Sequence, residues 1–477
     1  MQSHFDSEDI HAALALTQLR ISTKDWLPVP ETGLISGMDP EAYSIIIVNC
    51  QKRMVENLDH HKEVLGRVLS LPTDTASSMC DVFMRMASFL DWDTNGRCIG
   101  VANIAMALSI VAYMTVPGSM ARNELCASCV GGVDLDKVAS LLVDPRRAVL
   151  LMTFDSDAHN SMLGGCTTQH NSATKIKEHI VSVFQGQAIV VNLPSPNSEA
   201  VGIINSFCNE KTQGGIPHII NELDPSCKTV IVAAESIKVE WDTKMKLGTP
   251  AMFKSKLPIS NQDYCEYHNT SLPVHVDTES GCISVRIDAK LGNDGTSRSM
   301  IFVLPPEGTE EDIAFTYART LKLSHLKSTK VDFFSVPVVD IETNTLDGKQ
   351  LLQSAGVAEV FDSACSMQPF FNTPSNVSGG CIVTRIVHKS RIAWDRKGCV
   401  AEAATVVEVS YRSLAPPPEG MDIRFNRPFL AILGKVVDGT SFVPEFTTFV
   451  KGPSASKECL GNHAPDDMGD DDEDDEE

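Results

Sequence analysis

Residues 394–429 read WDRKGCVAEAATVVEVSYRSLAPPPEGMDIRFNRPF. Gly398 opens a run of small and β-branched residues. A basic residue then precedes a small one at Arg412-Ser413, and three prolines follow at 416–418. Proline has no amide hydrogen to give to a sheet, so these prolines keep the end of the segment out of one. The pattern predicts an extended, accessible loop with a cleavable bond.

The run before the basic residue also has the pattern of a strand with one buried face. Alternate side chains of a strand point to opposite faces. Both glutamates, Glu402 and Glu408, belong to one set. The other set is uncharged and suits burial: Cys399, Ala401, Ala403, Thr405, Val407 and Val409. The segment can therefore become a strand buried on one face.

Taken together, these residues resemble the reactive-centre loop of a serpin (serine protease inhibitor). In that family a glycine is followed by small residues that end in Ala-Thr, here Ala404-Thr405. The scissile bond lies a fixed distance beyond the glycine, and counting from Gly398 places it between Arg412 and Ser413. The resemblance implies a hinge formed by Gly398, Cys399, Ala401, Ala403, Ala404 and Thr405.

The resemblance extends in unbroken order over roughly residues 77–453. Glu199–Ile216 is similar to the family's helix that ends in Ile-Asn-Ser-Trp, and Thr229–Trp241 resembles its long central strand, with Ala233 in place of the usual asparagine. Val383–Arg396 matches the strand that carries His-Lys, here His388-Lys389. The implied fold class is α+β, with three β-sheets, about eight to nine helices and an exposed reactive loop at 396–424.

The two ends of the chain fall outside the resemblance. Residues 1–76 are expected to be an N-terminal extension of unknown role, in which Gln51–Leu69 has the pattern of a helix. Residues 454–477 are expected to form a disordered acidic tail, which carries much of the net charge of -22. This charge argues against a nucleic-acid partner, because nucleic-acid binders need a basic face.

The N-terminus, MQSHFDSEDIHAALALTQLR, lacks the basic start and apolar core of a secretory signal. We therefore expect a cytoplasmic protein with reduced cysteines, or an extracellular one if the start is misannotated. The stretch Cys98–Val116 is long enough to span a bilayer, but a helix buried in a large core is the preferred interpretation, without a membrane partner.

No motif indicates a metal, a cofactor or an enzyme. Cys126-Ala-Ser-Cys129 lacks a second ligand pair at a zinc-site spacing, so two surface or half-buried thiols are expected. His388 is interpreted as a core histidine, and His60-His61 as part of a solvated helix face. No Ser/His/Asp order indicates catalysis.

The function implied by the resemblance is suicide inhibition of a trypsin-like serine protease through a covalent complex, with the inhibitor a monomer. Arg412 suits the acidic pocket of such a protease. Four departures keep two alternatives open, a non-inhibitory binding or chaperone protein and a decoy substrate. Arg396 and Lys397 replace the usual acidic residues, and Cys399 replaces Thr or Ser. Glu402 replaces a customary small residue on the outward face, and Gly100–Asn103 replaces Ser-Pro-x-Ser.

Overall fold

The computed structural model describes most of the chain between residues 57 and 452, together with Cys50, Arg53 and Met54. The ranges outside the description within that span are 93–96, 116–117, 133, 155–179, 186–187, 228, 256–257, 293–294, 309–310, 363–382, 384–385 and 402–420. All statements about structure below concern the described residues.

Helices with apolar faces form one part of the molecule. Polar side chains cap four of them. For example, Asp74 accepts a hydrogen bond from the Ser77 amide at the start of α5, and Asn197 accepts one from the Ala200 amide at the start of α11. The described helical elements are α4 (Leu58–Ser70), α5 (Thr75–Ser88), α6 (Val101–Tyr113), α7 (Met120–Leu125), the π-helix η2 (Cys126–Val130), α8 (Leu135–Leu142), α11 (Ser198–Lys211), α12 (Glu311–Thr320), the 3-10 helix η3 (Leu323–His325), α13 (Gly348–Ser354) and α14 (Glu359–Asp362).

The strands form four sheets. A three-stranded sheet has the order β2-β1-β3 and a four-stranded sheet the order β12-β13-β14-β4. An eight-stranded sheet has the order β15-β11-β8-β9-β10-β16-β17 with β5 beside β8, and β6 pairs with β7. The strands are β1 (Arg147–Phe154), β2 (Ala188–Leu193), β3 (Thr229–Glu235), β4 (Ile237–Glu240), β5 (Lys246–Leu247), β6 (Ala251–Phe253), β7 (Ile259–Gln262), β8 (Tyr264–Val276), β9 (Ile283–Asp288), β10 (Ser297–Leu304), β11 (Lys327–Pro337), β12 (Val339–Asp347), β13 (Val387–Trp394), β14 (Gly398–Ala401), β15 (Met421–Arg424), β16 (Phe429–Val437) and β17 (Ser441–Val450).

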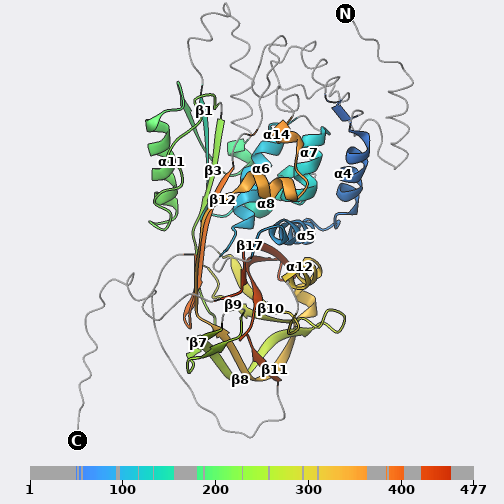
Figure 1. Ribbon diagram of the computed structural model, residues 1–477, viewed down its shortest axis with the longest axis vertical. Coiled ribbons are helices and arrows are strands. Elements are labelled where there is room, and N and C mark those ends of the chain that lie inside the picture. Colours follow the sequence, from blue (N-terminus) through green and yellow to red (C-terminus); the bar gives the residue numbers. More distant parts are fainter. Residues whose placement is uncertain are drawn as a thin grey trace, which may run out of the picture.

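We call the three-stranded and the four-stranded sheet together the main sheet, because the chain of β3 in the first continues after Ser236 into β4 of the second. Helix α11 packs on one face of β1 and β3, and α6 packs on the other (Figure 1). Outward side chains of β3 such as Val232 and Ala234 join the cluster beneath α11, whereas Ile231 and Ala233 face the main core. Strands β10, β16 and β17 of the eight-stranded sheet adjoin that core.

Several predicted elements have shifted bounds. The long strand predicted at Thr229–Trp241 is interrupted at Ser236, because β3 pairs with β1 whereas β4 pairs with β14. Helix α5 begins at Thr75, directly after its cap residue Asp74 and just before the start of the predicted resemblance at residue 77. The apolar stretch near residue 100 is the buried helix α6, and no helix of the described residues is long and apolar enough to cross a membrane.

Candidate functional site

The chain reverses direction between β13 and β14 in a tight turn at 395–397. The Asp395 carboxylate accepts hydrogen bonds from the amides of Lys397 (2.7 Å) and Gly398 (3.1 Å), and the Asp395 amide donates to the Gly398 carbonyl (3.0 Å). Aspartate is well suited to such turns because its short side chain reaches amides two and three residues ahead. This closed turn fixes where the predicted loop begins.

The segment after β4 holds the turn from the other side. Trp241 donates from its amide to the Lys397 carbonyl (3.0 Å) and from its indole to the Asp395 carbonyl (2.8 Å). The Met245 amide donates to the Arg396 carbonyl at 3.0 Å. Arg396 and Lys397 replace the acidic residues usual in the resembling family. Their backbone carbonyls accept the hydrogen bonds that tie the turn to the segment after β4.

Strand β14 lies between β13 and β4 and is antiparallel to both. Cys399 pairs with Trp394 on one side and Val239 on the other, and its side chain is fully buried. Burial raises the pKa of the Cys399 thiol, so the thiol stays neutral and behaves as a small apolar group. The first residues of the predicted loop are thus already part of a sheet rather than exposed, which differs from our expectation.

Gly398 makes this pairing possible. A Cβ at this position would overlap the Val239 carbonyl oxygen and lie 3.0 Å from the Cα of Glu240. Only glycine allows β14 and β4 to approach so closely.

We expect Gly398→Ala to lower the free energy of unfolding by about 1–3 kcal/mol and to loosen β14, because the clash is with backbone that cannot move aside. Urea unfolding and limited proteolysis of the hinge would measure both effects. Gly202→Ala in α11 is the matched control, because an added Cβ there meets nothing within 4 Å. Equal behaviour of the two variants would contradict the assigned role of Gly398.

A slot opens in the main sheet where β14 ends. We define the central slot as the space between Ala233–Glu235 of β3 and Val387–Arg391 of β13, a cavity of about 40 Å³ that is partly open to solvent. No ladder joins β3 to β13 within the described part of the chain. Residues after α11, including Ile216 and Ile219, cover the slot from one face, and Asn103 of α6 and Phe446 line the other.

Polar groups lie at the base of the slot. The Nε2 of His388 accepts a hydrogen bond from the Gly100 amide (3.1 Å), and burial lowers the pKa of His388 to about 4. The Asn103 amide donates to the Ala233 carbonyl (3.0 Å), while its Oδ1 is buried and has no partner among the described residues. His388 is therefore the buried core histidine predicted from the sequence. Ala233 stands where the strand of the resembling family has asparagine, and its carbonyl accepts a hydrogen bond from the side-chain amide of Asn103 on α6.

Comparison with known proteins supports the same architecture. The family model for serpins, serine protease inhibitors, matches residues 165–441, which is more than half of the chain. The chain belongs to the serpin family. Known serpin structures share its fold: the native state of the thermophilic serpin tengpin aligns with a TM-score of 0.60, covering 80% of this chain and 95% of that one at 17% identity.

Similar serpins have different described roles. Serine proteinase inhibitor 2.4 of Apodemus sylvaticus is 26% identical over 57% of this chain and 64% of its own length, and alpha-1-antichymotrypsin of Pongo abelii is 26% identical over 50% and 55%. The aligned stretch is thus less than two thirds of either relative. The complex of thyroxine-binding globulin with thyroxine has a TM-score of 0.58 at 17% identity, covering 80% of this chain and 99% of that one.

The structure of this serpin brings together part of the predicted hinge. Gly398, Cys399 and Ala401 lie in β14. Ala403, Ala404 and Thr405 of the hinge, and the predicted scissile pair Arg412-Ser413, lie outside the described residues.

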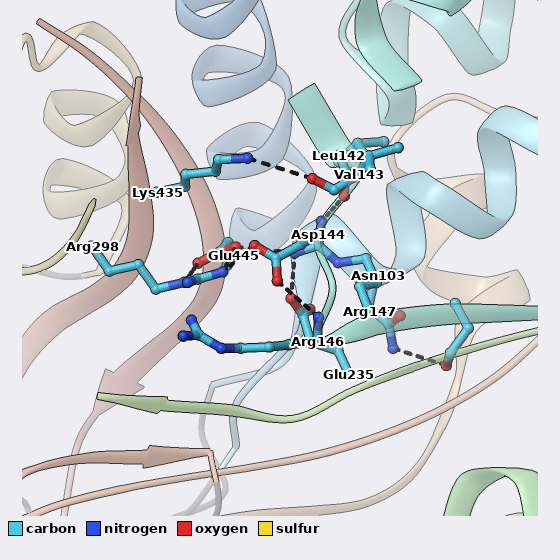
Figure 2. A network of polar contacts seen from close by, with 11 residues as sticks. Asn103, Leu142, Val143, Asp144, Arg146, Arg147, Glu235, Arg298, Lys435 and Glu445 are labelled. Atoms are coloured by element: carbon cyan, nitrogen blue, oxygen red, sulfur yellow. Dashed lines mark hydrogen bonds and ion pairs between the residues drawn. The ribbon is translucent and has the colours of Figure 1, made fainter. Parts of the chain in front are cut away.

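A buried charge network lies beside the slot and was missed in the sequence. Arg298 of β10 donates to both oxygens of Glu445 (2.8 and 3.1 Å) and to Asp144, and Arg147 of β1 donates to Glu445 (3.2 Å) and to Glu235 (Figure 2). All five side chains are at least nine-tenths buried. The network joins β1 and β3 of the main sheet to β10 and β17, and its signal in the sequence was charged residues within or at the ends of apolar strands.

Glu235 is the member of this network that lines the slot. Five side chains supply two guanidinium groups and three carboxylates, so one negative charge has no counterpart within the set. The Oε2 of Glu235 is buried without a partner in the described structure. Burial raises the pKa of Glu235 to about 7, although the neighbouring Arg147 acts in the opposite direction.

Two further expectations were wrong. Cys126 and Cys129 are fully buried, not at the surface, because the π-helix η2 packs both of them against α5 and α6. His61 is also buried, and His60 contacts the buried carboxylate of Glu124 at 2.7 Å. Helix α4 therefore packs on α7 and η2 rather than presenting both histidines to solvent.

Proposed function

We propose that this serpin is a suicide-substrate inhibitor of a trypsin-like serine protease, which is cleaved between Arg412 and Ser413. The observation that carries the proposal is the central slot, open along β3 and β13 and already occupied at one end by β14. A loop that has begun to pair with both neighbouring strands needs only to continue in the same register. The edges of β3 and β13 supply the backbone groups to which it would bond.

In the proposed mechanism the protease serine attacks the carbonyl carbon of Arg412. The peptide bond to Ser413 breaks, the Ser413 amine leaves with the proton from the protease, and Arg412 stays attached as an ester. The freed loop then enters the slot as a new central strand and carries the attached protease with it. Displacement of the ester from the protease site stops its hydrolysis.

The register of β14 favours insertion of the whole hinge. We propose that the inserted strand keeps this register, in which Glu402 would lie beside Arg391, a residue that also binds Asp340 of β12 (2.9 and 2.7 Å). Opposite charges across neighbouring strands stabilise a sheet by roughly 0.2–1 kcal/mol. The glutamate that replaces the small residue usual in the family thus has a cationic neighbour at its inserted position.

A denaturing gel of the purified protein incubated with trypsin tests the proposal. We expect a band at the summed mass that survives boiling and is absent for Arg412→Ala. Cleavage of the wild-type chain without that band would reduce the role to a decoy substrate or a binding protein with a serpin fold.

A further inference from the structure

Helix α4 is attached to the rest of the protein by a small apolar contact. It packs on α7 and on the π-helix η2 (Figure 1). Its buried side chains are those of His61 and Val64, whereas Leu69 is 48% exposed. A helix of 13 residues is marginal in water by itself, so α4 depends on this contact for its structure. One of its two buried anchors is therefore a group that can take up a proton.

A buried carboxylate joins α4 to two other helices. Glu124 of α7 is fully buried, and its Oε1 lies 2.7 Å from the Nε2 of His60. Its Oε2 accepts hydrogen bonds from the amides of Ala358 and Glu359 at the start of α14, both at 2.8 Å. Ahead of α4, Arg53 lies 3.4 Å from the carboxylate of Glu359. Helix α4 thus lies as a strap over α7, η2 and α14.

The surroundings of His61 disfavour a proton on its ring. The charged and titratable groups that α7, η2 and α14 bring to this contact are Arg122, Glu124, Cys126, Cys129 and Glu359. Burial raises the pKa of both thiols, which stay neutral, and Glu124 is bound to His60 and to α14. On α4 itself, Arg67 donates to the Ser128 hydroxyl and to the Ala355 carbonyl. Burial, and after it the charge of His60, lower the pKa of His61 from 6.5 to about 4.

We propose that α4 is an acid-released strap: uptake of a proton by His61 undocks the helix from α7 and η2, while the rest of the fold stays in place. Because the docked state holds His61 neutral, docking expels a proton, and its equilibrium constant falls as the pH falls from about 6.5 to about 4. Between pH 7.5 and pH 5, His61 alone weakens docking about 30-fold.

His60 acts in the opposite direction. A protonated His60 makes a stronger hydrogen bond to the Glu124 carboxylate, so acid strengthens this contact. Release by acid must therefore come from His61, and the two neighbouring histidines can be told apart by substitution.

Hydrogen exchange followed by mass spectrometry tests the release at pH 7.5 and pH 5, with the intrinsic exchange rates corrected for pH. We expect peptides from Leu58–Ser70 of the intact chain to lose protection by up to about 30-fold at pH 5, while β16 and β17 keep theirs. His61→Leu should abolish this loss, because leucine fills the buried position and takes up no proton. His60→Gln is the matched control: it should lower the protection of α4 at both pH values and keep a fall at least as large as that of the wild type.

Three results would overturn the inference: no fall in the wild-type chain, an equal fall in His61→Leu and the wild type, or a fall that extends equally to β16 and β17. The last would mean that acid unfolds the whole protein. If His61→Leu does not fold at pH 7.5, His61→Phe gives the same comparison. The chain stays uncut throughout, so the outcome is independent of the proposed inhibition.

Discussion

Cleavage of the loop is expected to raise the stability of this serpin by on the order of 10 kcal/mol, because the freed segment becomes a strand in the central slot. Each new ladder hydrogen bond contributes about 1 kcal/mol net, and burial of Val407 and Val409 adds about 1.5–3 kcal/mol each. An inserted segment that kept the register of β14 would pair along the whole of β3.

Thermal melts before and after limited trypsin digestion measure this gain. Arg412→Ala is the control, because the uncut variant should keep the melting temperature of the intact chain under the same digestion. A cut chain that melts at or below the temperature of the intact chain would mean that the loop does not insert. Such a result would support a binding or decoy role.

Arg298→Met is expected to lower the free energy of unfolding by about 3–5 kcal/mol. Arg298 is 1% exposed and bonds both oxygens of Glu445 as well as Asp144. Methionine fills a similar volume, but it removes the positive charge and the hydrogen bonds that Arg298 gives to these two carboxylates. A buried charge that has lost its partner is costly. Urea unfolding with tryptophan fluorescence would measure the loss.

The matched control is Arg286→Met. Arg286 also donates two guanidinium hydrogen bonds to one carboxylate, that of Asp288, at 2.6 and 3.0 Å. Here, however, the Arg286 and Asp288 side chains are 22% and 38% exposed. Pairs this accessible contribute at most about 1 kcal/mol. A loss for Arg298→Met no larger than for Arg286→Met would show that the network does not hold β10 and β17 to the main sheet.

The face on which Cys399 lies was predictable from the sequence, whereas its place in a strand was not. Alternation placed Cys399 on the buried face, and Cys399 is indeed buried between Trp394 and Val239. The occupied state of β14 was not predictable, because it depends on the close approach of Gly398 to Val239, two segments far apart in the chain. Composition alone cannot show which strand fills a gap.

Neither the charge network nor the central slot could be predicted from the sequence, for a similar reason. Glu235 sits in the run TVIVAAESIKVEW, where a single charge in an apolar strand signals a buried partner without naming it. Its partner is Arg147 on β1; Arg147 also binds Glu445 of β17, which in turn binds Arg298 of β10. Likewise, the hydrogen bond from the Asn103 side chain to the Ala233 carbonyl becomes visible only when the structure shows α6 packed on β3.

Hydrogen exchange of the intact and cleaved chains, followed by mass spectrometry, tests loop insertion most directly. Peptides that contain Ala233–Glu235 and Val387–Arg391 line the central slot, while the ladder between β16 and β17 serves as the internal reference. We expect the slot peptides to become strongly protected after cleavage while the reference stays unchanged. Equal exchange of the slot peptides in the two forms would contradict insertion of the loop as a new strand.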